Sequence, residues 1–335
     1  MVTDTIAADG QADVSDALQR LIDANPNRTI YFPDGTYLLC KPIATSAYPK
    51  RSVELNLSRY AVLKAAPGWS GSEAMVRLGG REHVDEVRST QHIRTVGSNY
   101  SFTGGVVDGS GVANGISIDS GRETAIRQVS IKHTRVGIHV KLRAADSLSS
   151  DADISDVNIV GNRATNSIGV LVEGFDNTFT GMRIADVFTG FLLKSSGNSL
   201  RNIHPLYTCD YRNYANSSGF NDRSGNNWYS FCYSDHFGVG FVTAEGRASV
   251  YDSCFCMWYA PNKGLRHTVF RAEGAFNSVV NNMTVGFKGA EAINTVLEEL
   301  KPTGKGVFQN LRMNESLVNE TERRYAVYLR GRVIH

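Results

Sequence analysis

Four ionisable side chains in the second half of the chain are of the types that act as general acids, general bases or nucleophiles: Asp235, His236, Glu245 and Glu273. Glu245 and Glu273 each stand in an Ala-Glu-Gly triplet. If their segments stack, the two carboxylates would lie about 5 Å apart, the separation used by retaining glycosidases. That closeness would raise one pKa and leave the other carboxyl ionised, giving an acid and a nucleophile or base. The alternative is that both are turn residues that point into water.

Asp235 and His236 follow Ser234 in a predicted turn before Gly238. The carboxyl group of Asp235 could act as a general acid or base, and the imidazole of His236 as a proton shuttle or hydrogen-bond donor. The alternative is an ordinary surface turn. These four residues are the predicted catalytic residues.

Aromatic residues gather between positions 207 and 259. Two adjacent pairs occur among them, Trp228-Tyr229 and Trp258-Tyr259. In a strand, neighbouring side chains point to opposite faces, so one ring of each pair should face outward, where it could stack on a sugar ring. Phe231, Phe241 and Phe255 are expected in the core instead.

Four charged residues of alternating sign each stand four residues after a glycine that opens a predicted strand, and in stacked coils they would form a column. It consists of Asp119, Lys141, Glu173 and Lys194. One interpretation is a solvated charge ladder whose pairs each contribute a few tenths of a kcal/mol. The other is the groove of a polyanion lyase, in which a Lys takes a proton next to a carboxylate. Glu173 and Lys194 are therefore also predicted substrate-binding residues.

These side chains must be positioned by a repeat. Segments such as GVLVEG (169–174) and GFVTAEG (240–246) share an opening Gly, an alternating apolar strand and a closing Gly. The closing glycines recur at roughly 22–28 residues. Each unit holds two or three short strands and no helix, which is typical of a right-handed parallel β-helix with coils about 4.8 Å apart.

The start of the chain predicts a cap. Residues 13–25 form an amphipathic helix with Asp13 as N-cap. The segment NRTIYFPDGTYLL (27–39) follows and could be a β-hairpin or the first coil of the repeat. We favour the coil, with Pro33-Asp34-Gly35 as a turn between two sheets.

This N-terminal helix and first coil resemble those of the pectate-lyase-like superfamily, in which a helix caps the open end of a β-helix. TGGVVDGSG (103–111) is similar to a coil of polygalacturonase-related members, but their Asp-Asp and Gly-His-Gly elements are absent. Inulin fructotransferases are similar in placing an Asp and a Glu about ten residues apart around a Gly-Val coil. Asp235, Gly238-Val239 and Glu245 match that spacing. The resemblance implies the fold and leaves the reaction open.

Composition narrows the function classes. The sequence has 35 basic and 33 acidic residues, so no global field selects nucleic acid or an anionic membrane. No apolar run is long enough to span a membrane.

The five Cys residues are expected to be free thiols in a reducing compartment, with buried core residues favoured over a metal site. We expect no cofactor and no metal. The first residues show no secretory signal, which predicts a cytoplasmic protein; a secreted or virion-associated one is the alternative if the sequence was trimmed.

Together these patterns predict an all-β, single-stranded right-handed parallel β-helix over 1–335: a capping helix at 13–25, coils over about 27–290, and a C-terminal cap or assembly segment at 291–335. That last segment is expected to hold a short helix near 291–300 and strands at 306–312 and 325–334. The predicted partner is an oligo- or polysaccharide, cleaved or intramolecularly transferred by paired carboxylates, with a neutral sugar favoured by the near-neutral charge. The alternatives are a lyase or epimerase with a Lys base, and a non-catalytic glycan-binding spike. A homotrimer is a further expectation from this architecture.

Overall fold

The computed structural model describes residues 6–47, 51–81, 100–142, 151–244, 247–258, 265–287, 293–301 and 303–313. They form two compact units. Unit 1 is Met1–Asn162 with Ser167–Thr178, and unit 2 is Arg163–Asn166 with Phe179–His335. The prediction of one domain over the whole chain stays a prediction.

Unit 1 contains one helix, α1 (Ser15–Ala24), among its described residues. Its strands are β1 (Asp9–Asp13), β2 (Arg28–Phe32), β3 (Gly35–Leu39), β4 (Ile43–Ser46), β5 (Val53–Leu57), β6 (Ala61–Ala65), β7 (Ala74–Arg81), β8 (Ser101–Thr103), β9 (Val106–Asp108), β10 (Asn114–Ile118), β11 (Ala125–Arg127), β12 (Ser130–Thr134), β13 (Val136–Val140), β14 (Asp153–Ser155), β15 (Asn158–Gly161) and β16 (Ile168–Val172).

Unit 2 contains a 3₁₀-helix, η2 (Tyr211–Asn216). Its strands are β17 (Thr178–Ala185, in this unit from Phe179), β18 (Thr189–Leu193), β19 (Ser199–Leu206), β20 (Ser218–Asp222), β21 (Trp228–Ser230), β22 (Tyr233–Asp235), β23 (Val239–Thr243), β24 (Val250–Asp252), β25 (Phe255–Trp258), β26 (Arg266–Ala272), β27 (Val279–Asn281), β28 (Thr284–Phe287), β29 (Ile293–Glu299), β30 (Val307–Gln309) and β31 (Arg312–Met313).

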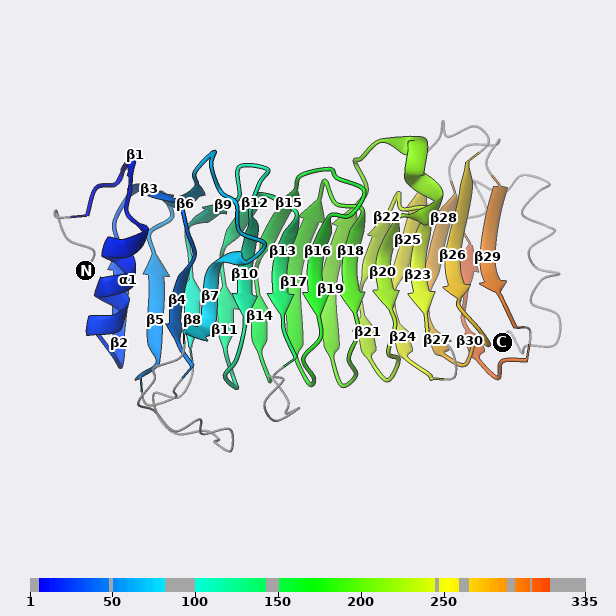
Figure 1. Cartoon of the computed structure of the whole chain (residues 1–335). Coiled ribbons are helices and arrows are strands. Elements are labelled where there is room, and N and C mark those ends of the chain that lie inside the picture. Colours follow the sequence, from blue (N-terminus) through cyan, green and yellow to red (C-terminus); the bar gives the residue numbers. More distant parts are fainter. Residues whose placement is uncertain are drawn as a thin grey trace. The chain divides into compact units, whose positions relative to one another are not determined.

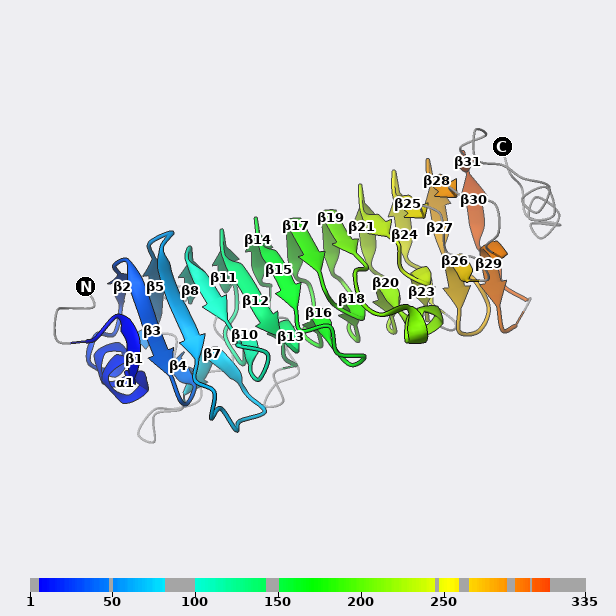
Figure 2. The same ribbon diagram turned by 90° about the horizontal axis from the view of Figure 1, so that it is seen from above.

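The strands stack in parallel within each unit, one coil upon the next (Figures 1 and 2). In unit 1, β4, β7, β10, β13 and β16 pair in that order. In unit 2, β18, β20, β23, β26 and β29 do the same. A second stack in unit 2 runs through β21, β24, β27 and β30, and a third through β22, β25, β28 and β31. The fold is the predicted right-handed parallel β-helix.

The segment 27–39 forms the first coil, as predicted. A hairpin would pair β2 with β3, whereas β2 pairs with β5 and β3 with β6, all in parallel. The helix before this coil begins later than expected, with Val14 as N-cap instead of Asp13. The carboxylate of Asp13 accepts from the Ser15 amide at 2.9 Å and from the Cys40 amide at 3.1 Å, so it joins the helix start to the first coil.

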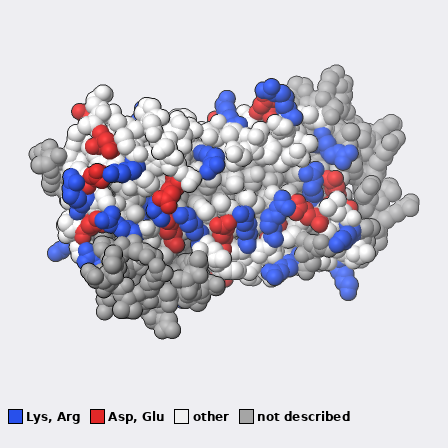
Figure 3. All heavy atoms as spheres, viewed as in Figure 1, with Lys and Arg blue, Asp and Glu red and all other residues white. Residues whose placement is uncertain are grey.

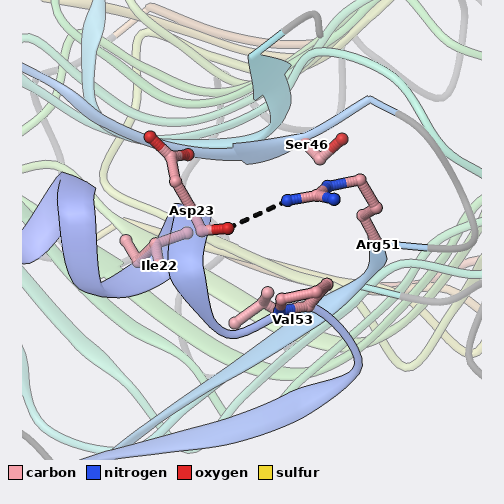
Figure 4. Close-up of a pocket in the computed structure, with 6 residues that line it drawn as sticks. Ile22, Asp23, Ser46, Arg51 and Val53 are labelled. Carbon is pink, nitrogen blue, oxygen red and sulfur yellow. Dashed lines mark hydrogen bonds between the residues drawn. The ribbon is translucent and has the colours of Figure 1, made fainter. Parts of the chain in front are cut away.

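The end of α1 is held by an arginine. Figure 4 shows a small pocket at this end, in which the Arg51 guanidinium donates to the backbone carbonyl of Asp23 at 2.9 Å. The Asp23 carboxylate pairs with Arg81 at 2.7 Å. A cation near the last carbonyls of a helix stabilises it, so this pocket serves the cap.

Aromatic rings fill the core of unit 2. Phe191, Phe220, Phe241 and Phe270 occupy equivalent positions of four coils, and successive ring centroids lie 6.0, 4.9 and 5.2 Å apart. Phe241 is in the core as predicted. Phe231 and Phe255 are not: the Phe231 ring is 55% exposed, and Phe255 is half-buried.

The described residues after position 290 add another coil. The predicted helix near 291–300 is wrong, because Ile293–Glu299 is a strand that pairs with β26. β30 and β31 confirm strands within about 306–313, whereas 325–334 lies outside the described residues. All five cysteines are free, and only Cys40 is exposed. No helix in the described part of the chain is long and apolar enough to cross a membrane.

Candidate active site

A carboxylate held between two imidazoles lies on the outer face of unit 2. Asp235 ends β22, and its partner in the register of the preceding coil is Leu206 in β19. Side chains two residues apart in a strand point to the same face, so His204 lies beside Tyr233 and Asp235. His204 Nε2 is 3.2 Å from one carboxylate oxygen of Asp235, and His236 Nδ1 is 2.5 Å from the other.

The carboxyl group of Asp235 is ionised. Burial alone would raise its pKa, since Asp235 is only 8% exposed. Hydrogen bonds from His204 and His236, the charge of His236 and a hydrogen bond from Tyr233 outweigh burial and lower the pKa of Asp235 to about 2. An ionised carboxylate only accepts hydrogen bonds, so both imidazole nitrogens that face it carry hydrogen. Asp235 therefore cannot be the general acid at neutral pH.

Stacked rings continue the site across neighbouring coils. The His204 and Tyr233 rings are 4.1 Å apart and nearly parallel, at 17°. On the other side, the Phe255 ring lies 4.7 Å from Tyr233. These three rings and Asp235 share one outward face, because Ser234 between Tyr233 and Asp235 is fully buried.

The insertion 207–217 fixes the backbone around His236. The Tyr207 amide donates to the Asp235 carbonyl at 2.9 Å, and the Tyr214 hydroxyl donates to the Phe237 carbonyl at 3.2 Å. Gly238 lies so close that a Cβ there would be 2.2 Å from the carbonyl oxygen of Tyr214. His236 itself has a left-handed φ of 60°, and its amide donates to Met257 O at 2.9 Å.

The structure does not bring Glu273 to Asp235. The Gly238 carbonyl, at the corner that follows Asp235, accepts from the Thr268 amide. Glu273 lies five residues beyond Thr268 along an extended strand, which is about 16 Å. There Glu273 pairs with Arg223. Glu245 lies outside the described residues, so the described part of the chain contains no carboxylate pair of the predicted kind.

Of the four predicted sugar-stacking rings, one faces solvent among those described. Trp228 is 50% exposed. Tyr229 and Trp258 are buried and cannot stack on a sugar: the Tyr229 hydroxyl donates to Asp222 at 3.1 Å, and Trp258 Nε1 donates to the Phe237 carbonyl at 2.6 Å. Tyr259 lies outside the described residues.

The three members of the charge column that belong to unit 1 are all ion-paired or hydrogen-bonded to a side chain of opposite type. Lys141 Nζ lies 2.9 Å from Asp119, whose other oxygen is 2.7 Å from Arg77. Burial would raise the pKa of Asp119, but hydrogen bonds from Ser117, Lys141 and Arg77 lower it overall. Glu173 is 2.8 Å from His139 Nε2, and Lys194 is an exposed residue of unit 2. An ammonium group held in an ion pair has no lone pair to take a proton, which favours the ladder interpretation.

Opposite charges are intermixed over the face drawn in Figure 3. Among the described residues, no group of three or more His, Cys, Asp and Glu side chains is placed to hold a metal ion. Cys232, Cys254 and Cys256 are buried, and burial raises the pKa of Cys232 and Cys256.

Sequence reasoning missed His204 and Tyr233. The length of one coil could have predicted them. Asp235 is the register partner of Leu206, so Tyr233, two residues before Asp235, is level with His204, two residues before Leu206. The irregular insertion between these coils concealed that register.

The chain matches the family model described as rhamnogalacturonase A/epimerase, pectate lyase-like, over residues 2–204. It belongs to this family. The match includes His204 as its last residue, and Asp235 and His236 lie beyond it. A search of curated proteins found no match.

Several solved structures share the fold of this family member. The tailspike protein of E. coli bacteriophage HK620 has a TM-score of 0.63 and 11% identity, covering 91% of this chain and 63% of that one. ORF18 of Geobacillus virus E2 has a TM-score of 0.61 and 13% identity, covering 92% and 60%. This chain thus spans less than two thirds of those proteins. Alginate lyase from Paenibacillus sp. str. FPU-7 has a TM-score of 0.57 and 15% identity, covering 89% and 97%.

Proposed function

We propose that this protein is a carbohydrate-active enzyme that removes a proton from a sugar ring, with His204 as base and Asp235 as the residue that orients it. The reaction would be β-elimination or epimerisation at a uronate residue. The observation that carries the proposal is the ionised Asp235 carboxylate, held by His204 at 3.2 Å and by His236 at 2.5 Å beside half-buried rings.

The tautomer of His204 follows from its partner. Nε2 donates to Asp235, so in the neutral ring Nδ1 bears the lone pair. No partner of Nδ1 is found among the described residues. Asp235 orients the ring and stabilises the positive charge that forms when Nδ1 takes a proton, as the carboxylate does in a catalytic triad.

The elimination would balance without water. Nδ1 takes the proton on the carbon next to the uronate carboxylate, the neighbouring glycosidic C–O bond breaks, and the imidazolium that has formed gives its proton to the departing oxygen. A carbon–carbon double bond forms between the two ring carbons. In epimerisation, a proton from solvent adds to the opposite face of the same carbon, the imidazolium releases its proton to solvent, and the glycosidic bond stays intact.

The geometry favours this route over hydrolysis by paired carboxylates. Such pairs stand about 5–5.5 Å apart in retaining enzymes and 6.5–9.5 Å apart in inverting ones. Asp235 is ionised, and the described side chains that contact it are imidazoles and a phenol. The proposal also draws on the family description, which joins a hydrolase name with an epimerase name, and on the fold shared with an alginate lyase.

The test is product analysis with oligogalacturonate and oligomannuronate substrates. Elimination predicts an unsaturated product that absorbs in the ultraviolet, and His204→Gln should lower its rate at least about 100-fold, because Gln keeps a donor toward Asp235 but cannot take the proton. Epimerisation predicts solvent deuterium in the sugar without cleavage. New reducing ends without ultraviolet absorbance would refute the proposal in favour of hydrolysis.

A control variant removes a histidine elsewhere. His133→Gln in unit 1 changes an exposed imidazole that also has an Asp partner, Asp108, at 2.9 Å. It should leave the rate unchanged. Binding of the glycans without either product would instead favour the non-catalytic module.

A further inference from the structure

A phenylalanine occupies a left-handed backbone position that neighbouring coils give to small polar residues. The φ values are 53° at Asn202, Phe231, Ser253 and Asn282, and 52° at Asn310. The amides of Phe231, Ser253 and Asn282 each donate to a carbonyl of the next coil, so the positions are equivalent. Asn tolerates this conformation, whereas a bulky residue is strained in it.

The strain at Phe231 is not explained by packing in the core. Its ring is 55% exposed. It also takes no part in the row of side-chain hydrogen bonds that begins on the later coils, in which Asn310 Nδ2 donates to Asn282 at 3.1 Å and Asn282 Nδ2 to Asp252 at 3.3 Å. An Asn at position 231 would suit the backbone better, so neither the backbone conformation nor core packing accounts for the Phe231 ring.

Two guanidinium groups lack acidic partners among the described residues, that of Arg201 beside this ring and that of Arg183, which reaches the backbone of Asn202. The Arg201 guanidinium carbon lies 6.0 Å from the centroid of the Phe231 ring. Arg183 Nη1 donates only to backbone carbonyls, those of Met182 at 3.1 Å and Asn202 at 3.5 Å. Within the described residues, no carboxylate lies within ion-pair distance of either arginine, although many other arginines of the chain are paired.

Trp228 extends the same surface. Its register partners are Ser199 and Val250, and Ser230 beside it is the partner of Arg201. Trp228 is 50% exposed while Tyr229 is buried, so the indole, Ser230 and Phe231 all lie outward on one coil. The same coil continues to Tyr233 and Asp235, which joins this surface to the candidate active site.

We propose that Trp228, Phe231 and Arg201 form a binding subsite for a sugar that carries a carboxylate. The sugar ring stacks on the aromatic faces, and its carboxylate pairs with Arg201, whose planar fork suits a carboxylate and whose charge is otherwise unmatched. This inference rests on the proposed function for the identity of the glycan. It adds that this surface recognises the carboxylate of the sugar. It also replaces the expectation of a neutral sugar, which came from the net charge of the whole chain.

The experiment is a calorimetric titration of the full chain carrying Asp235→Asn, so that binding is measured without turnover. The probes are trimers of galacturonate and mannuronate, each compared with its methyl ester. We expect the acid form to bind at least tenfold more tightly than the ester. Arg201→Gln should abolish that preference, and the control Lys132→Gln, an exposed cation of unit 1, should keep it.

A second variant separates a binding role from a structural one. Phe231→Asn should weaken binding of acid and ester alike and raise the midpoint of thermal unfolding, because the strain is relieved. Ser253→Asn, at the equivalent position of the next coil, should leave binding unchanged. Equal binding of acid and ester, no binding of any probe, or a lower midpoint for Phe231→Asn would each overturn the proposal. Binding that depends on Arg201, together with a wild-type chain that makes no product, would refute the proposed reaction alone.

Discussion

The low pKa of Asp235 predicts a specific pH dependence of stability. Its ordinary value is 3.8 and its value in the folded chain is about 2. One pKa unit corresponds to about 1.4 kcal/mol, so ionised Asp235 contributes about 2 kcal/mol to the free energy of unfolding at neutral pH. Because the folded pKa is depressed, this contribution is present above about pH 4 and is lost as the pH falls toward 2. Linkage leaves about 1 kcal/mol of it at pH 3.

The perturbation that isolates this contribution is Asp235→Asn, which removes the charge and keeps the shape. The measurement is urea unfolding of both proteins at a series of pH values from 7 to 3. We expect the variant to be less stable by about 2 kcal/mol at pH 7, with the gap closing to about half that at pH 3. Wild-type stability should fall over this range more steeply than that of the variant.

Asp156→Asn is the matched control. Asp156 is an exposed turn residue of unit 1 with a left-handed φ of 55°, a conformation that Asn also tolerates, and it makes no ion pair with the described residues. It reports the general effect of losing one carboxylate. A gap between wild type and Asp235→Asn that stays constant from pH 7 to 3 would refute the assignment of Asp235 as a carboxylate stabilised by imidazoles.

Three further predictions follow from contacts near the site. Gly238→Ala should lower the midpoint of thermal unfolding and the catalytic rate together, because a Cβ would lie 2.2 Å from Tyr214 O; unchanged values for both would contradict the tight packing of the insertion. Trp258→Phe should cost about 1 kcal/mol of unfolding free energy in urea, since the Phe237 carbonyl loses the closer of its two side-chain donors and keeps the Tyr214 hydroxyl, while glycan affinity in calorimetry stays the same. Glu273→Gln should change the unfolding free energy by less than about 1 kcal/mol and leave activity intact, because its pair with Arg223 is partly exposed; a large loss of activity would restore Glu273 to the site.

The architecture was readable from local pattern. The alternation of apolar and polar residues between recurring glycines has the period of a coil, and stacking of such coils is the way in which short strands without helices bury their apolar faces. The segment 27–39 could be assigned to a coil because equivalent segments recur later in the chain. The C-terminal strand Ile293–Glu299 was predicted as a helix, since short apolar and acidic runs carry no period that separates the two structures.

The site depended on register, which only the tertiary structure decided. Asp235 and His236 were identifiable by residue type, but His204 lies 31 residues before Asp235 and meets it because their coils are stacked neighbours. The same stacking buried Tyr229 and Trp258 and left Phe231 exposed, although all are aromatic and stand in similar sequence surroundings. Residue chemistry thus came from the sequence. The stacking order of the coils decided the partners of each side chain. It therefore decided the charge state of Asp235 and left Arg201 without an acidic partner among the described residues.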